Sequence, residues 1–202
     1  IREYLKKSSN GRLTEPETRK ILKDVINGLI CIHNSEIVHY DIKLENFLID
    51  SKGKVKIADF GLSSFRKDEK GKNFTLCGTP NYLCPEILFK ESREQSYKVD
   101  VWAVGVSAFI MLTGKGPFEG PTKEITMENI KKRIYYIPKK VEISDEAKSF
   151  IKETMKWDTY ERPTAKNLLK HPFIAKNDDV PVYLYKREHL PQLNKEIITQ
   201  SI

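Results

Sequence analysis

The chain has 202 residues, of which 39% are hydrophobic and 31% charged, and its formal net charge is +7. This length and composition are typical of a globular unit with one or two domains and enough apolar residues for a core. The longest apolar stretch, Val101–Leu112, is shorter than the roughly 20 residues that a helix needs to cross a bilayer. We therefore expect neither a membrane-spanning protein nor a membrane partner.

The cysteines and the basic residues exclude other classes of protein. Three widely spaced cysteines without a Cys-x-x-Cys pair predict a reducing, intracellular compartment, most simply the cytoplasm. The densest basic runs are Lys131–Arg133 and Lys139-Lys140. Without an interleaved aromatic platform or a Cys/His module, a solvated face is favoured there over nucleic-acid or lipid binding. We expect no nucleic-acid partner.

The first half of the chain predicts a long helix and then a hairpin. Thr14-Glu15-Pro16-Glu17 is a helix start, and apolar residues then recur at helical spacing, which predicts an amphipathic helix over 15–34. Two short apolar runs, 47–50 and 55–58, flank Ser51-Lys52-Gly53-Lys54 and predict a β-hairpin.

The second half predicts helices after a long irregular stretch. Residues 59–97 are rich in Gly, Pro, Ser and Thr, and loops of this length are usually functional. Helices are expected over 98–113, 144–155 and 164–170, with shorter ones near 84–90 and 124–133. The last residues, 175–202, are expected to form a tail.

The segment His39–Asn46 combines an acid, a cation and an amide between a predicted helix and a predicted strand. A tight loop there would direct Asp41, Lys43 and Asn46 into one space. Thirteen residues after Asn46 comes Asp59-Phe60-Gly61. Phosphoryl transfer needs such a set: a carboxylate to orient the attacking hydroxyl, a cation to stabilise the transferred group, and an amide and a second carboxylate to hold Mg²⁺.

This pattern resembles the catalytic loop and the Asp-Phe-Gly motif of eukaryotic protein kinases, which have the same order and spacing. The resemblance implies that Asp41 is the catalytic base, that Lys43 contacts the γ-phosphate of ATP, and that Asn46 and Asp59 bind Mg²⁺. It also implies that Leu48 lies beneath the adenine. The ATP-binding residues implied in this way are Lys43, Glu45, Asn46, Leu48 and Asp59.

Residues Thr75–Glu86 resemble the end of a kinase activation segment, with Cys84-Pro85-Glu86 in place of the usual Ala-Pro-Glu. The resemblance implies that Thr79 hydrogen-bonds Asp41 and Lys43 and belongs with the catalytic residues. The pocket for the substrate residue after the phosphorylated one would be lined by Leu76, Pro80 and Leu83. Such a peptide-docking segment favours protein substrates over small molecules.

Further matches imply structural roles and a fold. In the family, the residue at Asp100 accepts hydrogen bonds from the catalytic-loop backbone, Glu86 pairs with Arg162, and His39 belongs to the catalytic-loop motif. The run His171–Ile174 resembles the end of the kinase domain. We therefore expect a kinase domain over 1–174 that is mainly α: a kinase-like C-terminal lobe, with helices around a buried central helix and one small β-hairpin.

The resemblance is closest to serine/threonine kinases, because Lys43 follows the catalytic acid by two residues and Gly78-Thr79-Pro80 lies downstream. Within them, Ile143–Lys148 and the hairpin turn resemble calcium/calmodulin-regulated and calcium-dependent kinases, whereas Thr75–Tyr82 with Ile137-Pro138 resembles polo-like kinases. The first group is preferred. Glu45 either attracts a basic substrate residue or is an exposed acid without specificity, and the sequence favours neither.

Two departures from the family pattern qualify these expectations. Tyr40 replaces the usual arginine before the catalytic aspartate, so a phosphate on Thr75, the candidate phosphosite, loses its main expected partner. No Gly-rich loop or strand lysine is found, so we expect the N-terminal lobe outside this chain and little activity from the chain alone. The alternative to an enzyme is a pseudokinase or truncated scaffold that acts by protein binding.

Overall fold

Helix α2 (Glu15–Asn34) begins and ends where the sequence predicts. The Thr14 side chain accepts a hydrogen bond from the Glu17 amide, and the Glu17 carboxylate accepts one from the Thr14 amide at 2.8 Å. This capping box satisfies amides that the first helical turn leaves unpaired.

The structure is a computed structural model, and it describes residues 1–8, 10–65, 80–89 and 97–176.

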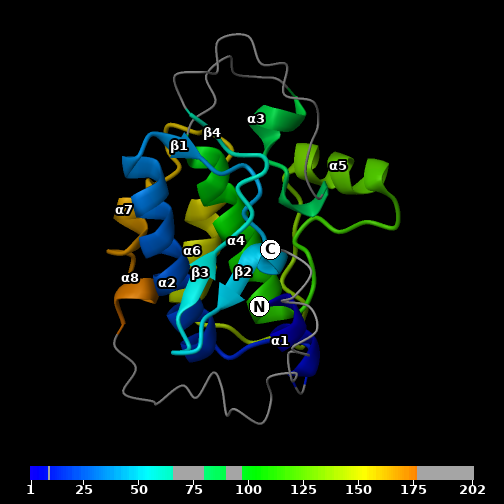
Figure 1. The fold of residues 1–202 in the computed structure, drawn as a ribbon. Helices are drawn as coiled ribbons and strands as arrows, with labels where there is room; N and C mark the ends of the chain where they lie inside the picture. The colour runs from blue at the N-terminus through cyan, green and yellow to red at the C-terminus, as the bar shows by residue number, and fades with distance from the viewer. Residues whose placement is uncertain (9, 66–79, 90–96, 177–202) are drawn as a thin grey trace, which may run out of the picture.

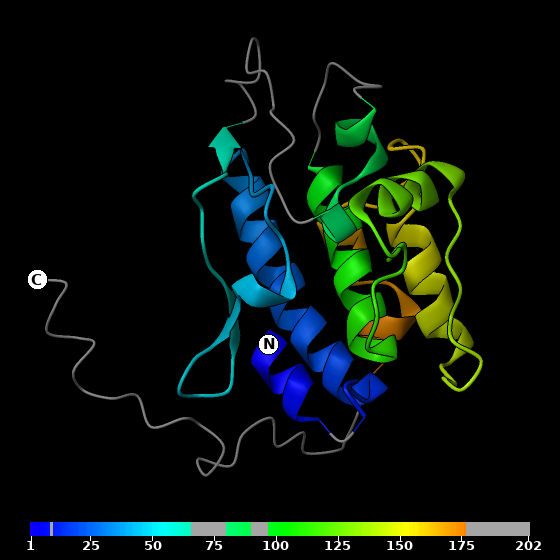
Figure 2. The ribbon, with the colours of Figure 1, turned by 90° about the vertical axis from the view of Figure 1, so that its right-hand side faces the viewer.

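Helix α4 (Lys98–Thr113) forms the centre of the molecule. Every residue from Val99 to Thr113 is buried, as expected for a helix that is apolar on all sides. It contacts α2 on one side and α6 (Asp145–Thr154) on the other, and the three helices lie side by side in Figure 2. Gly114 ends the helix in the left-handed conformation, with φ of 80°.

Shorter helices surround these three. They are α1 (Arg2–Lys7), α3 (Pro85–Leu88), α5 (Lys123–Lys132), α7 (Ala165–Leu168) and α8 (Pro172–Ala175), with 3-10 turns η1 (Leu44–Asn46) and η3 (Pro80–Tyr82) (Figure 1). The predicted helices over 84–90, 124–133 and 144–155 are present within two residues at each end. Within the described ranges, no helix is long and apolar enough to span a membrane.

The predicted hairpin is present as strands β2 (Phe47–Ile49) and β3 (Val55–Ile57), antiparallel with Phe47 opposite Ile57. The expectation of a single hairpin was wrong. Strands β1 (Ile37–Val38) and β4 (Ser64–Phe65) form a second antiparallel pair, with Ile37 opposite Phe65. Two-residue strands carry no periodic signal, so only tertiary packing brings these segments together.

Candidate active site

The loop that carries the predicted catalytic residues follows β1 and is fixed to the central helix by Asp100. This side chain is 1% exposed. Its two carboxylate oxygens accept hydrogen bonds from the backbone amides of His39 and Tyr40, both at 2.9 Å. The His33 ring of α2 lies 2.9 Å from the same carboxylate. A buried carboxylate with several partners is a firm anchor, because breaking them would leave its charge unsatisfied.

The backbone turns sharply at Tyr40, directly after this anchor. Tyr40 has a φ of 64°, in the left-handed region that a residue with a large side chain seldom occupies. Such a conformation persists only where the surrounding contacts hold it, and Asp100 supplies one through the Tyr40 amide. The turn brings Asp41 into the site.

Asp41, Lys43 and Asn46 are joined by direct hydrogen bonds. The Lys43 ammonium donates to both carboxylate oxygens of Asp41, at 2.9 and 2.7 Å. The Asn46 amide nitrogen donates to the backbone oxygen of Asp41 at 2.8 Å and to its carboxylate at 2.9 Å. Asp41 and Asn46 are each 8% exposed. The acid is therefore held in one orientation by a cation and an amide.

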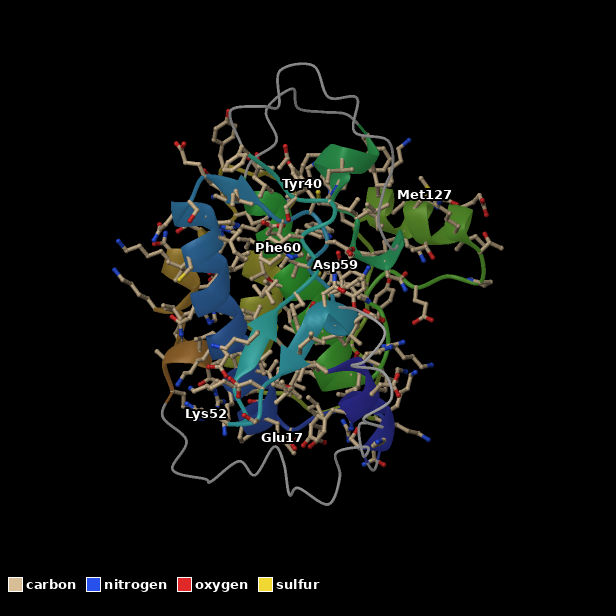
Figure 3. All side chains as sticks on the ribbon, viewed as in Figure 1. Glu17, Tyr40, Lys52, Asp59, Phe60 and Met127 are labelled. Atoms are coloured by element: carbon tan, nitrogen blue, oxygen red, sulfur yellow. The ribbon has the colours of Figure 1, made fainter. Side chains whose placement is uncertain are left out.

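Asp59 leaves the same end of the hairpin as Asn46. The Ala58 amide donates to the backbone oxygen of Asn46 at 2.9 Å, so the residue after Ala58 begins beside the loop. Asp59 is exposed and has a φ of 64°, and its carboxylate accepts a hydrogen bond from the Gly61 amide at 3.2 Å. Figure 3 shows Asp59, Phe60 and Tyr40 above the β2–β3 hairpin, whereas Lys52 and Glu17 lie at the far end.

His39 links the loop to the hairpin end. Its Nδ1 accepts a hydrogen bond from the Asp41 amide at 3.2 Å, and its Nε2 lies 3.2 Å from the Ala58 carbonyl oxygen. A neutral ring with its proton on Nε2 satisfies both contacts. Burial lowers the pKa of His39, against the opposing charges of Asp100, Asp41 and Asp59. The ring therefore stays neutral near pH 7.

The available oxygens suit Mg²⁺ shared with a nucleotide. The Asn46 amide nitrogen is already bonded to Asp41, so its oxygen is the atom left for a ligand, and the exposed Asp59 carboxylate is the second hard donor. No group of three or more His, Cys, Asp or Glu residues that could hold a metal occurs in the described part of the chain. Mg²⁺ commonly uses one or two protein oxygens and completes its shell with phosphates and water.

Comparison with known proteins agrees with this geometry. The model of the protein kinase domain matches residues 1–174. The chain belongs to the protein kinase domain family. It is 39% identical over 178 residues to the "Probable cell cycle serine/threonine-protein kinase CDC5 homolog" of Encephalitozoon cuniculi, which covers 88% of this chain and 38% of that protein.

Two other relatives of this kinase domain are serine/threonine kinases as well. PLK1 of Xenopus laevis is 39% identical over 81% of the chain and 27% of its own length, and CDC5/MSD2 of Saccharomyces cerevisiae is 36% identical over 79% and 23%. The chain thus spans less than two fifths of the length of these relatives. They are polo-like and CDC5 kinases, so the preference for calcium-regulated kinases is not supported.

The other predicted nucleotide residues of the kinase domain are exposed. Leu48 lies on β2 with 54% of its surface exposed. Glu45 is exposed in η1, and its carboxylate lies 3.5 Å from the Arg2 guanidinium of α1. Glu45 is thus already paired with a cation of this chain, although an exposed pair of this kind is weak.

The predicted substrate pocket is only partly described. Leu83 is buried and lines a small pocket together with Asp41 and Tyr40. Thr75, Leu76 and Thr79 lie outside the described residues, as does the Pro80 side chain.

Glu86 and Arg162 meet in a bidentate ion pair, the contact that the sequence predicts. The Arg162 Nη1 and Nη2 atoms lie 2.7 and 3.2 Å from the two Glu86 oxygens. Arg162 also donates to the backbone oxygens of Lys98 and Lys156 and stacks over the Trp102 ring at 5.0 Å. These contacts join α3 at the end of the activation segment to the start of α4.

Tyr82 is a residue of the site that sequence reasoning missed. Its hydroxyl accepts a hydrogen bond from the Leu44 amide at 3.4 Å, and burial raises its pKa, so it remains protonated. It lines the pocket beside Asp41 and also a second pocket, of about 500 Å³, that contains Arg2 and Glu45. A lone tyrosine in an irregular stretch gave no signal for this position.

Proposed function

We propose that the protein is an ATP- and Mg²⁺-dependent serine/threonine kinase of the polo-like group, which transfers the γ-phosphate of ATP to hydroxyl groups of protein substrates. The proposal is carried by the Asp41 carboxylate, which Lys43 and Asn46 hold in one orientation. The exposed Asp59 supports it, because it directly follows Ala58, whose amide donates to the backbone oxygen of Asn46. That the relatives are serine/threonine-protein kinases supports the choice of hydroxyl.

In this proposal Asp41 orients the substrate hydroxyl and accepts its proton. The hydroxyl oxygen forms a bond to the γ-phosphorus while the bond from that phosphorus to the β–γ bridging oxygen breaks, and ADP leaves. Lys43, already 2.7 Å from Asp41, supplies positive charge next to the transferred group. Asn46 and Asp59 would hold Mg²⁺, which neutralises phosphate charge when bound.

The exposed apolar side chains beside the site support a covering lobe outside this chain. Leu48 is 54% exposed and Phe60 49% exposed. Apolar surface next to a nucleotide site is the kind that a second lobe buries. In this proposal the nucleotide lies between that lobe and the face that carries Leu48, and the complete protein is the active form.

The test is Asp41→Asn in the full-length protein, with phosphate transfer from ATP to a serine/threonine peptide library as the readout. Loss of a positioned base should lower turnover by about 10²–10⁴-fold. Nucleotide binding, followed with a fluorescent ADP analogue, should be retained. Asp145→Asn, at an exposed position of α6, is the matched control and should be active. A variant at Asp41 with most of the parent activity would contradict the proposal.

A protein-binding pseudokinase is the second candidate, and Tyr40 is the observation that favours it, because the family arginine is absent there. The unmutated full-length protein distinguishes the kinase from the pseudokinase, because only a kinase transfers phosphate. A full-length protein that binds nucleotide but transfers no phosphate to any library peptide would establish the pseudokinase instead.

A further inference from the structure

A basic segment lies away from the catalytic residues. Residues 131–140, here called the basic strip, have the sequence Lys-Lys-Arg-Ile-Tyr-Tyr-Ile-Pro-Lys-Lys, with five cations and no acid. They form the end of α5 and the chain that follows it. Figure 2 shows this part of the chain along the side opposite the β2–β3 hairpin.

The basic strip is held in place by its inward side chains. The Tyr135 ring makes T-shaped contacts with Phe109 and Phe118, both with centroids 5.7 Å away, and Ile137 packs against the core. Arg133 has a φ of 58°, and its guanidinium stacks over the Trp157 ring at 4.2 Å. The strip therefore presents a defined surface.

The outward side chains of the basic strip are apolar or aromatic between two groups of cations. Tyr136 is 79% exposed and Ile134 is 40% exposed. Tyr136 is an exposed aromatic residue between the two basic runs. The sequence-based prediction of a solvated face there rested on the lack of an interleaved aromatic platform. A large exposed side chain of this kind, rimmed by charge, is typical of binding surfaces.

The cations of the strip are unequally engaged. Lys132 pairs with Glu128 at 2.6 Å. Lys139 and Lys140 are exposed and have no ion-pair partner among the residues that the structure describes. Two uncompensated charges at one end of an exposed aromatic surface favour an anionic ligand.

The main chain between the two groups of cations is also available. Residues 135–137 are outside any helix or strand, and their amides make no backbone hydrogen bond within the described ranges. An extended peptide could pair with such a segment and direct alternate side chains toward Ile134 and Tyr136. An extended peptide can use both the amides and the carbonyl oxygens of this segment, whereas the phosphates of a lipid surface or a nucleic acid can only accept from its amides.

We propose that the basic strip is a docking surface for a short, extended acidic segment of a partner protein that carries apolar residues between its acids. The two groups of cations bind the carboxylates, and Ile134 and Tyr136 contact the apolar side chains. The surface is separate from the catalytic loop and goes beyond the proposed kinase activity, so its test uses binding rather than phosphate transfer.

The experiment measures fluorescence anisotropy of a labelled peptide, Glu-Asp-Leu-Glu-Phe-Asp-Glu, with the full-length protein at about 0.15 M salt, where charges are screened beyond about 8 Å. Lys139→Glu with Lys140→Glu should weaken binding by about tenfold or more, because both close charges are reversed. Tyr136→Ser should weaken it by about fivefold through loss of the aromatic contact. Binding should also fall as salt rises, since exposed charges are screened.

The control is Lys52→Glu with Lys56→Glu, which makes the same change of net charge on the hairpin. It should leave peptide binding within about twofold of the parent. The hairpin lies on the opposite side of the molecule, and salt screens the interaction between its charges and the bound peptide. An equal loss in this control, or a Tyr136→Ser protein with parent affinity, would overturn the proposal in favour of nonspecific attraction. Tighter binding to RNA or to phosphatidylserine vesicles that is unaffected by Tyr136→Ser would overturn it as well.

Discussion

Arg162 has no exposed surface, so its guanidinium is not hydrated. Its hydrogen bonds to protein groups compensate for the lost hydration. Among the described residues, Glu86 alone supplies the opposite charge; the other partners are backbone oxygens and an aromatic ring. Removing one member of such a pair leaves an uncompensated charge in the core, whereas removing both leaves only a packing defect.

We therefore expect Arg162→Met and Glu86→Leu each to lower the free energy of unfolding by about 3–5 kcal/mol. The double variant should lose less than the sum of the two, because no unpaired charge remains. Urea denaturation of the kinase domain measures all three. Lys148→Met, which breaks an exposed pair with Asp145, should cost less than about 1 kcal/mol. Additive losses in the double variant would contradict this account.

Tyr40 leads to a second prediction at the residue scale. It brings no positive charge to the place where the family arginine would bind a phosphate on Thr75, which lies outside the described residues. Thr75→Ala should therefore change turnover of the full-length kinase by less than about tenfold, since no strong partner is lost. Tyr40→Arg should make activity depend on phosphorylation at Thr75. A loss near a hundredfold for Thr75→Ala in the parent would refute this.

At the scale of elements, the contact between α4 and α6 depends on a glycine. A Cβ atom at Gly105 would lie 2.8 Å from the Thr154 Cβ, closer than real Cβ atoms approach, and 3.0 Å from the Met155 Cγ, which is a tight contact. Thr154 is itself fixed by a hydrogen bond to the Phe150 carbonyl at 2.7 Å. The two helices cannot keep this separation with any larger residue at position 105.

Gly105→Ala should therefore destabilise the protein by about 1–3 kcal/mol through overpacking, although alanine is the better helix former. The matched control is Gly28→Ala in α2, where the nearest atom is the Ile57 Cδ1 at 3.4 Å. That change should be neutral or stabilising by about 0.5–1 kcal/mol. Thermal unfolding compares the two variants, and equal melting temperatures for them would show that α4 and α6 can separate without cost.

At the scale of the whole molecule, the site depends on Asp100, which joins three elements. It accepts from the backbone after β1 and contacts His33 at the end of α2, while it belongs to α4. The orientation of Asp41 is thus set by the packing of the two longest helices. We therefore expect a displacement at one of these contacts to change the position of Asp41.

Asp100→Asn keeps the side-chain shape but leaves a single oxygen acceptor for several donors. We expect turnover in the full-length kinase to fall by about 10²-fold, the effect of a displacement near 1 Å at a catalytic group. Steady-state kinetics, with the unfolding midpoint measured in parallel, separate this effect from loss of fold. Asp145→Asn should again match the parent. Parent-like turnover for Asp100→Asn would show that the loop holds its shape without the anchor.

The sequence by itself determined the helices over 15–34 and 98–113, the hairpin and the family resemblance, because these depend on periodicity, capping residues and motif spacing within short windows. It also predicted which side chains carry the chemistry. It could not determine the β1–β4 pair, the place of Tyr82 or the engagement of Glu45 by Arg2. Those depend on contacts between residues far apart in the chain, and only the tertiary structure decides them.

The difference has one physical cause. Local sequence patterns indicate which backbone conformation a segment prefers. The energy of a buried charge or an exposed ring depends instead on the residues that surround it in the folded protein. Tyr136 is the clearest case: it stands next to Tyr135 in the sequence, yet one ring packs against the core and the other faces solvent. The sequence determined the chemical type of each side chain, and the tertiary packing decided which side chains are buried and which are exposed.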